Sequence, residues 1–213
     1  NALCLEAEWS DPYTDNCVSE GTFKNAKGNL VKANYMYSQE LEYIETANAT
    51  GFVKYYTGGD LAFVALLPNE GTSIDSYIAS LTGKGFLSAL NSRKNTQVNT
   101  QMPKFKCEYS NSLVDTLKKM GMSTAFDGDR ANFSSIADNS NGNIFIGEVI
   151  HKTYIEVAEK GTRAGAVTAV IAAKSAAMPV EQPKEVRLTR PFVYAIIDTQ
   201  TNLPLFIGAQ TDI

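Results

Sequence analysis

Residues 156–173 read EVAEKGTRAGAVTAVIAA, so a strand-like alternation ends at Glu159-Lys160-Gly161 and a tract of small and β-branched residues follows. The tract contains no acidic and no aromatic residue, and it is too short to cross a bilayer, which takes about 20 apolar residues. Small residues with Thr and Val enter a sheet interior without obstruction, and Gly161 supplies a hinge because glycine accepts unusual backbone angles. We therefore expect an exposed loop that is also a competent strand. Such a segment promotes aggregation, so a protein that retains one is expected to use it.

Three further motifs place this stretch in a family context. Residues 151–157 (HKTYIEV) and 159–167 (EKGTRAGAV) together resemble the serpin hinge, whose pattern is close to HKAxIEVNEEGTEAAAAT. Residues 190–194 (RPFVY) and 204–208 (PLFIG) are similar to the C-terminal signature of the serpins, and residues 102–106 (MPKFK) to their LPKFK motif. The resemblance covers nearly the whole chain and implies an α+β, β-rich serpin fold. That fold has a central mixed sheet that accepts the reactive loop, smaller sheets and a few helices.

The resemblance also implies how much of the family fold is present. Residues 1–9 (NALCLEAEW) resemble the NAxYFKGxW strand in the middle of the serpins, which are close to twice this length. We therefore predict that residues 1–213 are the C-terminal portion of a single serpin domain, with the hinge and reactive loop at 159–185. The helical N-terminal half of the same protein is then a required partner. We expect a bacterial or otherwise divergent inhibitory member, and we expect that the isolated chain does not fold alone.

Composition sets broad limits on function. Apolar residues make up 44% and charged residues 20%, which is ordinary for a globular protein. The net charge of −4 and the lack of a basic stripe argue against nucleic-acid binding, and no run is long enough for a membrane span. The three cysteines, Cys4, Cys17 and Cys107, are too few for a disulfide framework and are expected to be buried free thiols. Cysteine usage leaves the compartment open, and we expect an extracellular or cell-envelope location.

Hydrophobic periodicity predicts a β-rich chain with a few helices. Apolar residues at helical spacing also predict a helix with Leu113, Val114, Leu117 and Met120 on one face. Ser110 or Asn111 is its expected N-cap and Gly121 its stop. The other expected elements are strands over 1–9, 22–23, 30–37, 98–108 and 143–157, hairpins of 51–56 with 61–67 and of 186–197 with 203–208, and helices over 73–82 and 86–92.

An enzyme has little support in the sequence. Its single histidine, His151, lies in a strand pattern, and there is no Gly-x-Ser-x-Gly, no metal-ligand spacing of Cys and His, and no phosphate-binding motif. We therefore predict no enzymatic activity, no metal and no cofactor. Asn48 and Asn132 begin triplets that have the form of glycosylation sequons, and whether they are modified stays open.

The resemblance implies an irreversible, suicide-substrate inhibitor of serine proteases. A protease cleaves the loop and forms its acyl-enzyme, and the N-terminal part of the loop then enters the central sheet as a strand. About 14 residues at roughly 3.3 Å each carry the attached protease on the order of 45 Å, where it is distorted before it can deacylate. The alternatives are a non-inhibitory serpin with a binding or chaperone role and an inhibitor of cysteine proteases.

Site residues follow from the motifs. Asn1 and His151 match the pair that latches the serpin sheet, called the shutter. Trp9 and Glu159 match the breach, where the loop first enters. Alternation puts small side chains on the face that would be buried, with Arg163 on the other face. The hinge residues are Glu159, Gly161, Thr162, Ala164, Gly165, Ala166 and Thr168.

The scissile bond is less well defined. The usual family spacing from Glu159 leads to Ser175-Ala176, but the stretch from Thr162 to Pro191 is longer than in a typical serpin. Small residues favour an elastase-like or subtilisin-like target, and a bond after Lys174 would suit a trypsin-like one. The alternatives for the residue before the cut are Lys174, Met178 and Val180.

Overall fold

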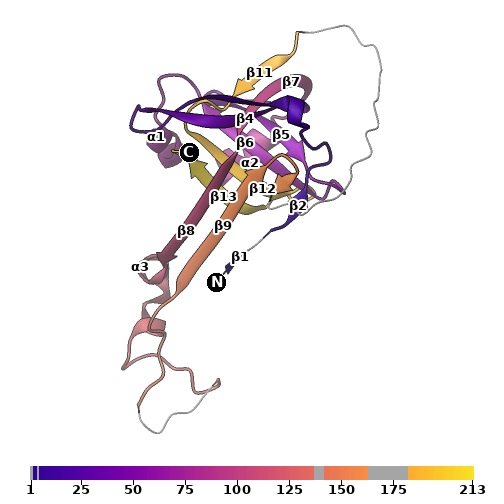
Figure 1. Ribbon diagram of the computed structural model, residues 1–213. Coiled ribbons are helices and arrows are strands. Elements are labelled where there is room, and N and C mark those ends of the chain that lie inside the picture. Colours follow the sequence, from indigo (N-terminus) through magenta and orange to yellow (C-terminus); the bar gives the residue numbers. More distant parts are fainter. Residues whose placement is uncertain (1, 4, 137–141, 163–181) are drawn as a thin grey trace. The chain divides into compact units, whose positions relative to one another are not determined.

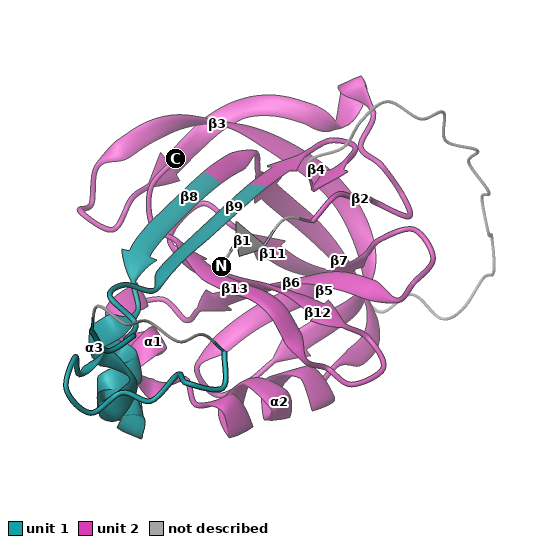
Figure 2. Ribbon diagram, turned by 90° about the horizontal axis from the view of Figure 1, so that it is seen from below, with its two compact units in different colours: residues 1–4, 107–155 teal, residues 5–106, 156–213 magenta. Residues whose placement is uncertain are grey.

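The computed structural model describes residues 2–3, 5–136, 142–162 and 182–213. The chain forms two compact units, one of residues 1–4 and 107–155 and the other of residues 5–106 and 156–213 (Figure 2). Strands β8 (Phe105–Ser112) and β9 (Ile150–Ala158) each run from one unit into the other.

The larger unit contains an eight-stranded sheet with the order β11-β7-β4-β5-β6-β12-β13, in which β3 also pairs with β4. All of its strands except β3 are labelled in Figure 1. All neighbours are antiparallel except β11 and β7, which are parallel. The strands are β3 (Val18–Lys24), β4 (Leu30–Glu45), β5 (Ala49–Tyr55), β6 (Leu61–Pro68), β7 (Lys94–Pro103), β11 (Lys184–Arg187), β12 (Phe192–Asp198) and β13 (Pro204–Gln210).

Strand β4 joins the two parts of this sheet. Residues 30–36 pair with β3, residues 35–43 pair with β7, and residues 42–45 pair with β5. The register against β7 shifts between Glu40 and Glu42, and Leu41 at the shift is 66% exposed. Such a bulge re-aims side chains on a strand, and here it occurs beside Glu40.

Two short helices cover part of the sheet. They are α1 (Ile74–Ser80) and α2 (Gly83–Asn91), capped by the side chains of Ser73 and Thr82. Their buried faces join strands β4, β5, β6 and β12 in one core, and each large apolar side chain buried there stabilises the fold by about 1.5–3 kcal/mol. Core residues include Ile44, Val53, Val64, Leu66, Ile74, Phe86, Leu90, Val193 and Ile197.

A second set of strand pairs in the larger unit involves β2 (Ala7–Glu8) and β10 (Gly161–Thr162). β10 is antiparallel to β2 and also antiparallel to residues 157–158 of β9. The 3₁₀ turn η1 (Asp15–Cys17) follows β2.

The smaller unit contains β1 (Ala2–Leu3), which is parallel to β9 with Ala2 opposite Lys152. α3 (Val114–Leu117) continues into a π-helical turn, η2 (Lys118–Met122), and a 3₁₀ turn, η3 (Ser123–Phe126). The predicted α+β, sheet-rich class is confirmed.

The hairpin of β5 and β6 and the helices near 73–82 and 86–92 are confirmed, and the strands expected at 22–23 and 30–37 are longer than predicted. The single strand expected over residues 1–9 is wrong. These residues form β1 and β2 instead, because β1 pairs with β9 whereas β2 pairs with β10. The predicted strands 98–108 and 186–197 are each broken. One break lies at Lys104 and the other just before β12, where Pro191 has no N–H to donate.

The predicted strand 143–157 begins only at Ile150. Ile144 and Ile146 are half-buried and Phe145 is 49% exposed, so the side chains alternate as expected. The backbone does not form a ladder over 143–149, and the N–H of Ile146 donates to the carbonyl of Ala125 instead.

The predicted N-cap of the third helix is wrong. Ser110 and Asn111 lie in β8, and α3 starts at Val114 without a side-chain cap. Gly121 has a φ of 103°, which favours glycine, and Met120 is 75% exposed rather than part of a buried face.

The cysteine prediction is right about free thiols and wrong about burial. Cys17 and Cys107 are free but only half-buried, and Cys4 lies outside the described residues.

Candidate functional site

The hinge begins as a strand. Gly161 lies opposite both Ala158 and Glu8, and Thr162 lies opposite both Val157 and Ala7. Thr162 is buried, with 2% of the residue exposed. The first residues after the Glu159-Lys160 turn are therefore already paired on both sides.

Gly161 is required by the space around it. Its φ is 154°, and a Cβ built at this position would lie 2.1 Å from the carbonyl oxygen of Ala7 and 2.7 Å from the Cα of Glu8. Any larger residue would push β10 away from β2, because backbone atoms cannot yield as a flexible side chain can.

Thr162 is held by a buried hydrogen bond. Its Oγ1 lies 2.6 Å from the hydroxyl oxygen of Tyr56, and the ring of Tyr56 stacks on Trp9 with centroids 4.4 Å apart and planes 13° apart. Burial raises the pKa of the Tyr56 hydroxyl, so it is protonated and able to donate.

Trp9 and Tyr13 bind the turn that precedes β10. The indole N–H of Trp9 donates to the carbonyl of Ala158 at 2.9 Å, and its backbone N–H donates to the carbonyl of Lys160 at 2.9 Å. The backbone N–H of Tyr13 donates to the carbonyl of Glu159 at 2.9 Å. We call Trp9, Tyr13 and Tyr56 the hinge clamp, because together they bind residues 158–162.

An ion pair fixes the side chain of Glu159. Lys104 Nζ lies 2.6 Å from Glu159 Oε1. Burial on its own raises the pKa of the Glu159 carboxyl, but the hydrogen bond and charge of Lys104 outweigh burial and hold that pKa below its ordinary value. A second ion pair, Lys106 with Glu156 at 2.8 Å, joins the same two stretches of chain, around residues 104–106 and 156–159.

His151 is half-buried in the smaller unit, and its ring meets Tyr109 edge-on with centroids 6.4 Å apart. Its Nδ1 atom is buried and finds no hydrogen-bond partner among the described residues. The predicted partner, Asn1, lies outside the described residues, so the shutter pair stays a prediction.

The larger unit thus brings together four residues that the sequence singled out: Trp9, Glu159, Gly161 and Thr162. Five residues predicted to flank the cleaved bond and four predicted for the hinge fall outside the described residues. These are Lys174, Ser175, Ala176, Met178 and Val180, and Ala164, Gly165, Ala166 and Thr168. Within the described ranges, no cluster of metal-ligating side chains is found, and no helix is long and apolar enough to cross a membrane.

Sequence reasoning missed Tyr13, Tyr56 and the buried Lys54, which lies beside the clamp. Tyr56 lies directly after β5 and immediately before the Thr57–Asp60 turn. Nothing local links it to Thr162, from which 106 residues separate it.

Comparison with known proteins gives consistent matches. The family model described as "Serpin (serine protease inhibitor)" matches residues 1–213. A serpin-like protein of Thermococcus kodakarensis is 32% identical over 208 residues, which cover 98% of this chain and 48% of that protein. Human serpin B3 is 32% identical over 213 residues, which cover 98% of this chain and 53% of that protein.

Among solved structures, native tengpin, a thermophilic serpin, superimposes with a TM-score of 0.89 and 45% identity over 100% of this chain and 54% of that one. The chain therefore spans about half the length of the proteins that it matches.

Proposed function

The chain belongs to the serpin family, and we propose that it is the loop-bearing part of an irreversible inhibitor of serine proteases. Family membership supports a protease-inhibitor type of function in general, rather than an enzyme. The observation that carries the finer proposal is β10, since Gly161 and Thr162 are paired on both sides and Thr162 is 2% exposed. A hinge that already has a strand partner on each side is poised to extend.

In the first step the loop acts as an ordinary substrate. The serine hydroxyl of the protease attacks the carbonyl carbon of Ser175, and its proton passes to the amide nitrogen of Ala176. The peptide bond breaks, and Ser175 becomes an ester of the protease.

In the second step the freed segment lengthens β10. Residues after Thr162 add ladder hydrogen bonds and bury alternate side chains, and Ala164, Ala166 and Thr168 are small enough for that face. The gain offsets the cost of separating strands that were paired. The attached protease is carried along and distorted before water can cleave the ester.

The target follows from the residue before the cut. Ser175-Ala176 suits elastase-like and subtilisin-like proteases with small apolar pockets, whereas Lys174-Ser175 would suit a trypsin-like enzyme. A cut after Met178 would call for a protease pocket that accepts a larger apolar side chain, and a cut after Val180 for one that accepts a β-branched side chain. We propose that the chain acts together with the N-terminal half that its relatives carry, and we call the two together the complete protein. We also propose an extracellular or cell-envelope location.

A non-inhibitory serpin with a binding or chaperone role is the main competing function within the family. Bulky, charged or proline residues would be expected along the face of the hinge that enters the sheet, and residues 164, 166 and 168 carry none. Inhibition of a cysteine protease is a second competing function, in which a thioester replaces the ester. A panel of proteases of both classes separates serine-protease from cysteine-protease inhibition.

Insertion is tested by cutting the loop of the complete protein with a protease that is then removed, and comparing the thermal unfolding of intact and cleaved forms. We expect the cleaved form to unfold at a clearly higher temperature, because its sheet has gained a strand. Equal unfolding temperatures for the intact and cleaved forms would contradict insertion.

A further inference from the structure

Lys54 on β5 is one of the largest fully buried side chains of the structure, with 1% of the residue exposed. Lysine is rarely buried unless its charge is paired, because removing an ammonium from water is costly. Its Nζ lies 2.8 Å from Glu40 Oε1, and the Glu40 side chain is itself only 12% exposed. The sheet thus contains a buried ion pair at a position where an apolar side chain would pack without that cost.

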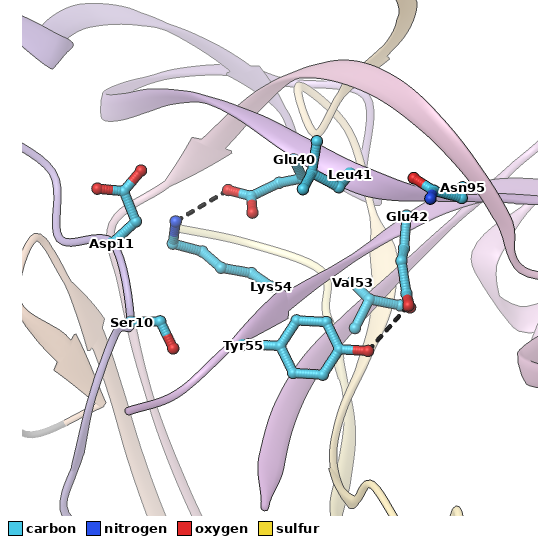
Figure 3. Close-up of a pocket in the computed structure, with 9 residues that line it drawn as sticks. All are labelled: Ser10, Asp11, Glu40, Leu41, Glu42, Val53, Lys54, Tyr55 and Asn95. Atoms are coloured by element: carbon cyan, nitrogen blue, oxygen red, sulfur yellow. Dashed lines mark hydrogen bonds and ion pairs between the residues drawn. The ribbon is translucent and has the colours of Figure 1, made fainter. Parts of the chain in front are cut away.

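Figure 3 shows the Lys54 ammonium pointing toward the Glu40 carboxylate, with both side chains lining a cavity of about 340 Å³. A second contact orients Glu40, because the hydroxyl of Ser38 donates to the same Oε1 atom at 2.5 Å. Ser38 Oγ also lies 2.9 Å from Thr100 Oγ1 on β7. The carboxylate is therefore fixed independently of the lysine, which gives the ammonium a defined location.

Two aromatic rings share that ammonium. Lys54 Nζ lies 4.5 Å from the ring centroid of Tyr13 and 5.6 Å from that of Trp9. A cation within about 6 Å of a ring centroid is attracted to the ring, and the attraction is larger when the cation is desolvated. The charge of Lys54 thus bears on both rings at once.

The same two residues bind the hinge turn through their backbones. Tyr13 N–H donates to the carbonyl of Glu159, and Trp9 N–H donates to that of Lys160. A shift of these two rings would also move the backbone N–H groups that hold the turn. It would thereby change how β10 enters between β2 and β9.

We propose that Lys54 is a positioning residue for the hinge. Its ammonium, held by Glu40, fixes Trp9 and Tyr13 so that their N–H groups hold residues 159–160 in the geometry of the inserted strand. The positioning is a property of the fold. Its consequence, insertion that is faster relative to hydrolysis of the acyl-enzyme, rests on the proposed inhibitory function.

The test uses the complete protein with the double substitution Lys54→Met and Glu40→Gln. The pair loses both charges but nearly keeps its volume, so no unpaired buried charge remains to unfold the sheet. Arg93→Met with Glu42→Gln is the matched control, because it removes both charges of another pair that includes a residue of β4 (3.7 Å) without touching the clamp. The first readout is the hydrogen-exchange rate of the Trp9 and Tyr13 amides, and the second is the number of inhibitor molecules consumed per protease trapped.

For the double variant we expect exchange at both amides to accelerate about 5-fold or more, since the two cation–π contacts are lost. Global unfolding should change little. Inhibitor consumption should rise about 2-fold or more, as slower insertion lets more acyl-enzyme hydrolyse. The control variant, Arg93→Met with Glu42→Gln, should leave all three values near those of the unmodified protein.

Unchanged exchange at Trp9 and Tyr13 in the double variant would overturn the proposal, whatever happens to inhibition. If exchange is faster in the double variant but neither it nor the unmodified protein traps a protease, the result would support the positioning role and reject the proposed inhibitory function. Faster exchange with unchanged inhibitor consumption would overturn the claim that the clamp speeds insertion.

Discussion

The hydroxyl oxygen of Tyr56 lies 2.6 Å from Oγ1 of Thr162, and both side chains are buried. The bond joins the residue directly after β5 to Thr162 in β10. Because the ring of Tyr56 stacks on Trp9, the bond also connects Thr162 to Trp9. The hinge is therefore held by side-chain contacts as well as by backbone hydrogen bonds to β2 and β9.

Tyr56→Phe removes this bond and leaves the Thr162 hydroxyl buried without that partner. An unsatisfied buried hydroxyl costs about 1–3 kcal/mol, so we expect a loss of stability in that range, measured by denaturant unfolding of the complete protein. Tyr77→Phe is the control, because Tyr77 is also buried but no hydrogen bond joins it to the described hinge residues. A loss for Tyr56→Phe no greater than for Tyr77→Phe would contradict the role given to the bond.

Gly161→Ala tests the close approach of β10 to β2. The added Cβ would meet the Ala7 carbonyl at 2.1 Å, so we expect β10 to leave its position and the inhibitor to become mainly a substrate. Gly83→Ala, in α2, adds the same methyl group where no atom beyond its chain neighbours and its own helix backbone lies within 4 Å, and should be neutral. Gel analysis of protease mixtures measures the ratio of complex to cleaved inhibitor. Full complex formation by Gly161→Ala would show that β10 tolerates a side chain there.

Thr162→Arg tests burial of the hinge face. An unpaired buried charge is costly, so the variant should be cleaved in the loop without trapping the protease, whereas Thr162→Ser should trap it nearly normally. The measurement is the yield of complex that resists denaturation. Equal yields from the two variants would count against insertion through this face.

The ion pair of Glu159 with Lys104 predicts a dependence on pH. The pKa of Glu159 is lower in the folded protein than its ordinary value of about 4.5. Its contribution to stability is therefore fully present above that value and is lost as the pH falls through the folded pKa. We expect the difference in stability between the unmodified protein and Glu159→Gln to be constant from about pH 7 to 5 and to shrink below about pH 4. Thermal unfolding across this range measures it, and a difference that persists unchanged to pH 3 would argue against the pair.

Local signals are enough to predict several elements. The turn at Thr57–Asp60 lies between two apolar runs and marks the hairpin of β5 and β6, and Ser73 before an apolar helical face marks α1. The ends of a strand are predicted less accurately when they depend on a partner strand that is distant in the sequence. Residues 143–149 alternate like a strand but pair with no strand, and residues 1–9 are divided between two different partners.

The candidate site likewise contains residues that local sequence motifs identify and residues that only the fold identifies. Glu159, Gly161 and Thr162 lie in one motif and can be found from sequence, as can Trp9 from a second motif. The buried Lys54 carries no such signal, because a lysine in an alternating strand is normally expected to face solvent. Only the fold shows that Glu40 and the rings of Trp9 and Tyr13 surround its ammonium.

The most direct test of the central claim mixes the complete protein with elastase-like, subtilisin-like and trypsin-like proteases and separates the products on denaturing gels. The released C-terminal peptide is then weighed by mass spectrometry. We predict a protease–inhibitor complex that survives denaturation, with a peptide that begins at Ala176, or at Ser175 for a trypsin-like enzyme. Cleavage in the loop by every protease without such a complex would contradict the inhibitory mechanism.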